Sequence, residues 1–253
     1  MGILDFIGGV LGKEDRKFIE ENAVADDKKI LVQMGAIIIY ANNAHGWTPQ
    51  TLKINQAKLT AAEVLKESWD IESREEAQEH IDALISTGGW RLAGGTEEYE
   101  DTEVESRAQI DERLARYAVG DDSALSPDES EMFEEVIDEI IGYDWNKLEI
   151  TSNTTDSVTT TLAWDIDRAA LISRLGYNAG FFSEAETLDV LRKTRAIAAS
   201  KFGSWLDYGI SFMKGRAVVM CESDLSGMVD VWGSIHLLMD PKWGEVWSWA
   251  PLK

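Results

Sequence analysis

The stretch TLAWDIDRAALISRLGYNAGFFSEAETLDVLRKTRAIAASKFGSWLDYGISFMKGR, residues 161–216, decides the fold of this chain. It places Trp, Asp, Arg and Tyr residues at helical spacing within segments that are otherwise apolar. Burying such polar groups costs free energy unless each of them finds a partner. The stretch therefore predicts buried helices whose polar residues form either a network that fixes the core or a binding site.

Helix start signals recur along the rest of the chain. A Ser or Thr followed three residues later by Glu, the pattern of a capping box, begins at Thr60, Ser73 and Ser183, and a fourth begins at Ser126, just before Pro127. Apolar residues at spacings of three and four follow these starts. We expect helices over residues 14–23, 28–42, 60–68, 73–87, 103–118, 127–142, 162–178, 184–201 and 204–219, and a short one over 228–238.

This pattern predicts a mainly α protein, a multi-helix orthogonal bundle with at most a small strand element. Two segments leave room for strands. Residues 30–40 contain enough isoleucine for a strand, although we favour a helix there, and residues 148–158 fit a loop or a short strand. Strands and helices do not alternate regularly, so a Rossmann-like sheet is not expected.

The 253 residues are enough for one large domain or two small ones. We expect an N-terminal helical segment at 1–60 that packs on the body, and an acidic helical half at 61–150. A half rich in Trp and Arg, with an aromatic C-terminal tail, follows at 151–253. The last two could form one domain. The tripeptide Trp-Asp-Ile occurs at 69–71 and at 164–166, but two short matches do not establish a duplication.

The net charge is −22, from 46 acidic and 24 basic residues, and residues 97–144 hold 18 acidic and three basic ones. Such a surface repels phosphate backbones, so no direct nucleic-acid binding is expected. It would attract a basic protein partner, unless the charge serves solubility alone. The candidate acidic interaction face comprises Glu131, Glu134, Glu135, Asp138 and Glu139.

The candidate network lies in the opening stretch. Asp165 and Arg168 are three residues apart and share a helix face, and Arg168 can reach back to Trp164 for a cation–π contact. These groups would form either a core network or a pocket in which an arginine holds an anion. The full candidate set is Trp164, Asp165, Arg168, Arg174, Tyr177, Trp205 and Arg216.

Signatures of catalysis and metal binding are missing from the sequence. His45, His80 and His236 are scattered, and the single cysteine, Cys221, excludes an intrachain disulfide. We find no HExxH, GxSxG, P-loop or GxGxxG pattern. We therefore expect no cofactor and no metal. No export signal or transmembrane segment is visible either, which favours a cytoplasmic protein.

The C-terminal tail is rich in large aromatic residues. Trp232, Trp243, Trp247 and Trp249 lie within eighteen residues of one another, beside Pro241 and Pro251. Aromatic side chains of this size are either buried or used at interfaces. We expect the tail to pack across the helical body, with an exposed partner-binding patch as the alternative.

Several of these features occur together in one family. In order along the chain they are Trp164, Asp165, Arg168, Gly176, Tyr177, Ser183, Glu184, Ser204, Trp205, Gly215 and Arg216, with Trp69 and Ile71 upstream. In this respect residues 69–219 resemble the YbeU/YbeR-type family of bacterial proteins of unknown function. The chain departs from that pattern after Arg216, where Val218 stands in place of an aromatic residue. The resemblance implies a mainly helical bacterial domain and assigns no catalytic residue.

Two functions follow from these observations. The first is a non-enzymatic protein-interaction module, for example an immunity-type protein that neutralises a basic partner. The alternative is an enzyme or a small-ligand binder, with a pocket around Trp164, Asp165, Arg168, Tyr177, Trp205 and Arg216. The sequence does not predict the oligomeric state.

Overall fold

The computed structural model describes residues 13–42, 45–86, 157–220, 225–239 and 246–253, together with residues 109, 112, 113, 115, 116 and 121. Over these ranges the chain forms nine α-helices, one 3-10 turn and an isolated antiparallel bridge between Ala23 and Thr51. The prediction of a mainly α protein is confirmed. None of the helices within the described ranges is both long and apolar enough to cross a bilayer.

The helices fall into two groups along the chain. The N-terminal group consists of α2 (Lys13–Glu21), α3 (Asp26–Lys29), α4 (Ala36–Ala41), α5 (Ala61–Trp69) and α6 (Arg74–Ser86). The C-terminal group consists of α11 (Leu162–Ala179), α12 (Glu184–Lys201), α13 (Trp205–Met220), α14 (Leu225–Met239) and the 3-10 turn η6 (Val246–Ser248).

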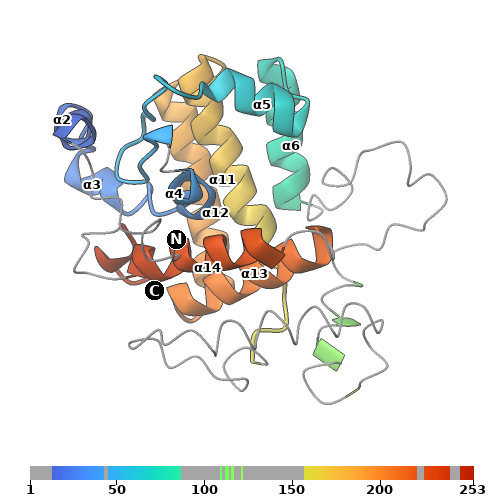
Figure 1. Ribbon diagram of the computed structural model, residues 1–253. Helices are drawn as coiled ribbons and strands as arrows, with labels where there is room; N and C mark the ends of the chain where they lie inside the picture. Colours follow the sequence, from blue (N-terminus) through green and yellow to red (C-terminus); the bar gives the residue numbers. More distant parts are fainter. Residues whose placement is uncertain are drawn as a thin grey trace.

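Helix α11 forms the centre of the fold. Every residue from 163 to 176 is buried, because α4, α5, α6, α12 and α13 all pack against this helix. Figure 1 shows α12 beside α11, with α13 and α14 running across their lower ends. The helix contributes Trp164 and Ile166 to one hydrophobic cluster and Ala169 and Ile172 to a second. A helix buried on all sides has few places for polar groups, so each of its charged residues needs a partner inside the protein.

The predicted helix starts are found where the capping boxes lie. The Thr60 and Ser183 side chains each accept a hydrogen bond from the backbone N–H of the Glu three residues on. The carboxylate of that Glu in turn accepts a hydrogen bond from the backbone N–H of the cap residue. Ser73 pairs with Glu76 in the same way. Ser204 accepts a bond from the N–H of Asp207 at the start of α13. The box at Ser126 and the helix expected over 127–142 lie outside the described residues.

The prediction of one continuous helix over 28–42 is wrong, and so is the strand alternative for this segment. Helix α3 ends at Lys29, turns follow, and α4 begins after Gly35, which has a left-handed φ of 69°. A Cβ on Gly35 would lie 2.9 Å from the backbone nitrogen of Leu171. The turn is therefore pressed against α11, and buried side chains of α11 bond the polar backbone groups that the break leaves free.

Candidate functional site

The guanidinium of Arg168 lies between two tryptophan rings near the start of α11. Its central carbon is 4.7 Å from the ring centroid of Trp69, at the end of α5, and 4.8 Å from that of Trp164. An Nη1 atom lies 3.5 Å from Oδ1 of Asp165, whose side chain has no exposed surface. Two aromatic faces and a carboxylate thus surround a positive charge that is 3% exposed.

The two Trp-Asp-Ile segments meet at this arginine. Trp69 and Trp164 supply the rings, and Ile71 and Ile166 are both buried in the core. The two aspartates differ, since Asp165 is buried whereas Asp70 is exposed and ends α5 in the left-handed conformation, with a φ of 52°. The repeated tripeptide therefore marks the two sides of one contact between helices.

The Gly215-Arg216 pair of α13 also lies close to Trp164. The Arg216 guanidinium carbon is 6.0 Å from the centroid of that ring. A Cβ added to Gly215 would lie 2.3 Å from Cβ of Trp164 and 3.1 Å from the carbonyl oxygen of Thr161. Only glycine lets α13 pass this close to the start of α11. The structure therefore brings Trp164, Asp165, Arg168 and Arg216 together in one cluster.

Arg174 belongs to a different group of contacts. It is fully buried, and its two Nη atoms donate to four backbone carbonyls, those of Val32, Met34, Pro49 and Thr51, at 2.6–3.2 Å. Burial lowers the pKa of Arg174, and the charge of Asp167 partly offsets this. Arg174 thus ties the segment that runs from the 31–35 turn to Thr51 onto α11.

Asp167 and Tyr208 are two residues of this second group that the sequence analysis did not single out. Oδ1 of Asp167 accepts hydrogen bonds from the N–H of Gly35 and from Oη of Tyr208, both at 3.1 Å. Burial raises the pKa of Asp167 to about 7. The available signal was the spacing of Asp167 and Arg174, which lie seven residues apart and therefore share one face of a helix.

Trp205 contacts the C-terminal tail. Its ring stacks on Trp247 at 4.7 Å with an interplanar angle of 7°, and its Nε1 donates to the carbonyl of Ala250. Gln33 and Arg195 hold the tail through its backbone carbonyls. The described part of the tail, 246–253, packs across the helical body as expected. Tyr177 is half-buried and packs against the same hydrophobic cluster as Trp205.

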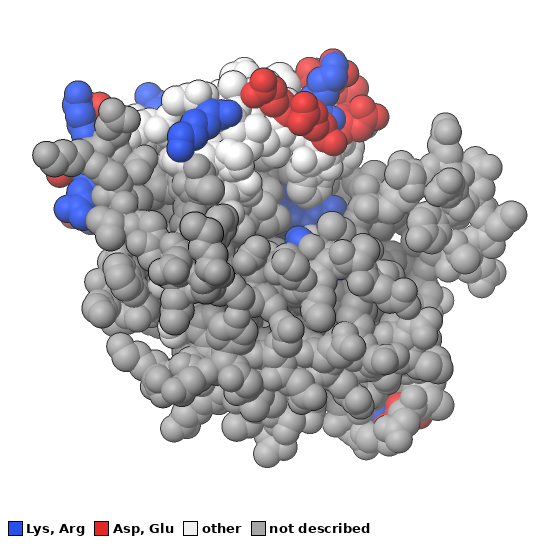
Figure 2. All heavy atoms as spheres, in the orientation of Figure 1, with Lys and Arg blue, Asp and Glu red and all other residues white. Residues whose placement is uncertain are grey.

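Acidic side chains gather over α5 and α6. Figure 2 shows them at the upper right of the molecule. Residues 61–86 hold eight acidic residues, all exposed, and two basic ones. Both basic residues are already paired, Lys66 with Glu72 at 2.9 Å and Arg74 with Glu186 at 2.6 Å. The predicted face, Glu131, Glu134, Glu135, Asp138 and Glu139, lies outside the described residues and stays a prediction.

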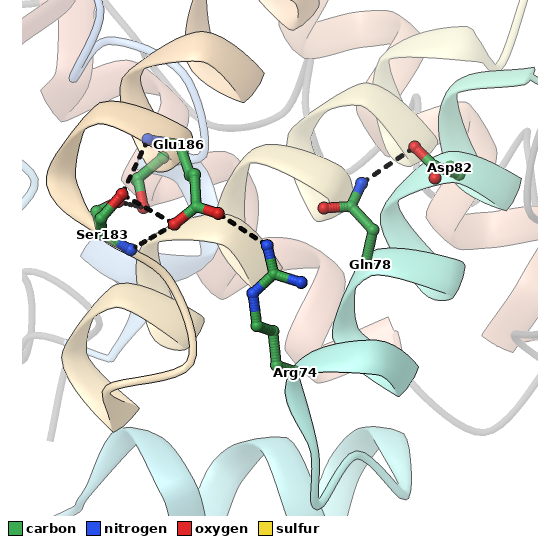
Figure 3. A network of polar contacts seen from close by, with 6 residues as sticks. Arg74, Gln78, Asp82, Ser183 and Glu186 are labelled. Carbon is green, nitrogen blue, oxygen red and sulfur yellow. Dashed lines mark hydrogen bonds and ion pairs between the residues drawn. The ribbon is translucent and has the colours of Figure 1, made fainter.

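The pair of Arg74 and Glu186 joins α6 to the start of α12. Figure 3 shows the Glu186 carboxylate bonded to Ser183 on one side and to Arg74 on the other. Hydrogen bonds from the Ser183 hydroxyl and backbone N–H, together with Arg74, lower the pKa of Glu186 to about 2. One exposed carboxylate thus caps α12 and bridges two helices.

The buried arginines of α11 are already engaged by protein groups, which limits their ability to bind a ligand. Arg168 and Arg174 both contact protein groups on several sides. Among the described residues, no three His, Cys, Asp or Glu side chains are grouped so that they could hold a metal ion. The eight acidic residues on and between α5 and α6, by contrast, are all exposed.

Comparisons with known proteins give a family and no activity. A family model described as "Protein of unknown function (DUF1266)" matches residues 64–249. No curated protein matches the chain, and no solved structure does. The matched range includes the tryptophans and arginines of the Arg168 cluster as well as Asp167, Arg174 and Tyr208.

Proposed function

The chain belongs to the DUF1266 family, whose description assigns no activity, and we propose that it is a non-enzymatic protein-interaction module that binds a basic protein. An immunity-type protein that neutralises a basic partner is the specific form that we favour. The likeness to the YbeU/YbeR-type proteins remains an expectation, as does a bacterial, cytoplasmic setting.

The distribution of charge along the chain supports this proposal. Acidic and basic residues balance over 1–60, with seven of each, and nearly balance over 145–253, with 13 and 11. The excess of acid falls between these parts, on residues 61–86 and 97–144. A field of one sign raises the rate of encounter with a partner of the opposite sign and discriminates against acidic proteins.

The exposed acids of α6 carry the argument. Glu75, Glu79 and Asp82 are spaced by four and three residues, which places them on one face of the helix. All three are exposed. The cluster around Arg168, by contrast, is enclosed by protein groups, which is the reason that we favour the interaction module over the enzyme or small-ligand binder.

Capture experiments with the full chain test the proposal. We expect the chain to retain a basic protein from lysate at low salt and to release it at high salt, because the attraction between exposed charges is screened. The triple variant Glu75→Lys, Glu79→Lys, Asp82→Lys should lose most of that binding. A second variant, with Glu131, Glu134, Glu135 and Asp138 changed to Lys, asks whether the predicted face takes part.

A matched control distinguishes the effect of charges on the α6 surface from the effect of the total net charge. The triple variant Glu20→Lys, Glu21→Lys, Asp27→Lys changes the net charge by the same amount on α2 and α3, which Figure 1 shows on the other side of α11 from α6. It should keep its partner. Equal binding by all the variants, or retention of acidic proteins only, would contradict the proposal.

A further inference from the structure

A single buried carboxylate connects α11 with α13 and with the turn before α4. We propose that Asp167 is a proton-operated clasp: the docking of residues 31–54 on α11 is tight when this carboxyl is protonated and loosens when it is ionised. This inference concerns the core of the protein and is independent of the acidic surface.

The geometry gives the carboxyl few partners. Oδ1 accepts bonds from the Gly35 N–H and the Tyr208 hydroxyl, and the N–H of Ile37 also faces the group. Oδ2 is buried, with no hydrogen-bond partner among the described residues. An ionised carboxylate offers about four acceptor sites. The bonds present fall short of what water provides, so the charged form is costly in this position.

The same turn also depends on Arg174. The Arg174 side chain donates to the carbonyls of Val32 and Met34. These two residues lie on either side of Gln33, which contacts the C-terminal tail. Asn178, one turn further along α11, bonds the carbonyl of Leu52 and the N–H of Ile54. Three side chains of α11 thus bond described residues of the 31–54 segment, and of these three Asp167 is the one that can change its charge near neutral pH.

Other charged or titratable groups lie on the elements around Asp167. On α11 itself they are Arg174, Asp165 and Arg168, and the last two contact each other. Tyr208 faces Asp167 from α13, and α4 carries no charged residue, only Tyr40. Among the described side chains of α14, which packs on α4, the titratable group is His236. The charged side chains of α5, α6 and α12 are exposed, except for Arg195, which bonds Gln33.

The direction of the effect follows from burial. The pKa of Asp167 is about 7 in the folded protein, against an ordinary value of 3.8. When residues 31–54 lift away, water reaches the carboxyl and the ordinary pKa returns. Opening therefore becomes more favourable as the pH rises from about 4 to about 7, by up to roughly tenfold per pH unit, and then levels off.

Native-state hydrogen exchange of the full chain, followed by mass spectrometry, measures this opening. For peptides that cover residues 31–42, we expect the opening equilibrium, corrected for intrinsic exchange rates, to be at least roughly tenfold larger at pH 7.5 than at pH 5.5. Asp167→Asn should remove the difference. The control Asp189→Asn, at an exposed position on α12, should keep it. A wild type without this difference, or an Asp167→Asn variant that retains it, overturns the proposal.

Two further measurements keep the test decisive if Asp167→Asn does not fold. The carboxyl carbon of Asp167, observed by NMR, should titrate near pH 7 in the wild type and at higher pH in Tyr208→Phe, which lacks one donor to the charged form. A midpoint near 4 overturns the proposal. The variant His236→Gln should keep the pH dependence of exchange, and its loss there would assign the effect to the histidine instead.

Discussion

The two buried arginines of α11 are held in opposite ways. Arg168, near the start of the helix, lies between the rings of Trp69 and Trp164 and against Asp165. Arg174, two turns on, donates to four backbone carbonyls of a distant segment. The first arginine packs side chains of two helices together. The second replaces the hydrogen bonds that an irregular segment cannot make for itself.

This difference determines what is lost when each arginine is removed. Aromatic faces attract a cation, but they do not need one, so they can pack together after its removal. A buried carbonyl that loses its donor pays the full cost of desolvation. We therefore expect substitution of the two arginines to lower the free energy of unfolding by different amounts, although both side chains are almost fully buried.

The largest effect is expected from Arg174→Ala. This change strands four carbonyls and leaves Asp167 without its positive neighbour, so the free energy of unfolding should fall by about 3–5 kcal/mol. Urea denaturation measures it. Arg192→Ala, at an exposed position on α12, is the control and should unfold like the wild type.

A smaller loss, about 2–3 kcal/mol, is expected from Arg168→Ala. The variant removes a cation from the two tryptophan faces and from Asp165, whereas Arg174→Ala leaves four backbone carbonyls without their donor. Arg168→Lys keeps the charge but not the planar stacking, and it should recover part of the loss. Arg168→Ala could instead prove more destabilising than Arg174→Ala in the same denaturation assay. The claim that unpaired carbonyls cost more than unoccupied aromatic faces would then be wrong.

The smallest effect is expected at an exposed arginine, Arg74, whose pair with Glu186 is open to solvent on both sides. Ser183 and Arg74 hold the pKa of Glu186 at about 2. The stabilisation from this group is therefore complete above pH 4.5 and is lost as the pH falls toward 2.

Urea midpoints at pH 7 and pH 3 test this expectation. Arg74→Ala should lower the midpoint slightly at pH 7 and less at pH 3. Glu186→Gln should weaken the acid sensitivity of the wild type. If Arg74→Ala lowered the stability as much as the substitution of either buried arginine, burial would not explain the ranking of the three variants.

The sequence predicts the regular helices well because their start signals are local. Capping boxes at Thr60, Ser73 and Ser183 each involve residues only three positions apart, so the printed sequence contains both partners. The contact of Arg168 with Trp164 is of the same kind, being four residues apart on one helix. The approach of Trp69 from α5 has no such local signal.

The sequence does not indicate the break at Gly35, because its cause is distant along the chain. Residues 28–42 contain a helical pattern, but the bonds that stabilise the turn come from Asp167, 132 residues away, and Arg174, 142 and 140 residues away. The isoleucines and alanines within residues 28–42 give no sign of these distant hydrogen-bond partners. The assignment of Asp167 and Tyr208 to one contact likewise needs the packing of α13 on α11.

The reliance of the 31–54 segment on α11 has a consequence for synthesis of the chain. A ribosome adds roughly 5–20 residues per second, so the guanidinium that completes this segment emerges on the order of ten seconds after the segment itself. The tail arrives later still, since Trp247 donates to the carbonyl of Gln33 across 214 residues. The first part of the nascent protein therefore stays incompletely folded until the residues around Trp247 have left the ribosomal exit tunnel.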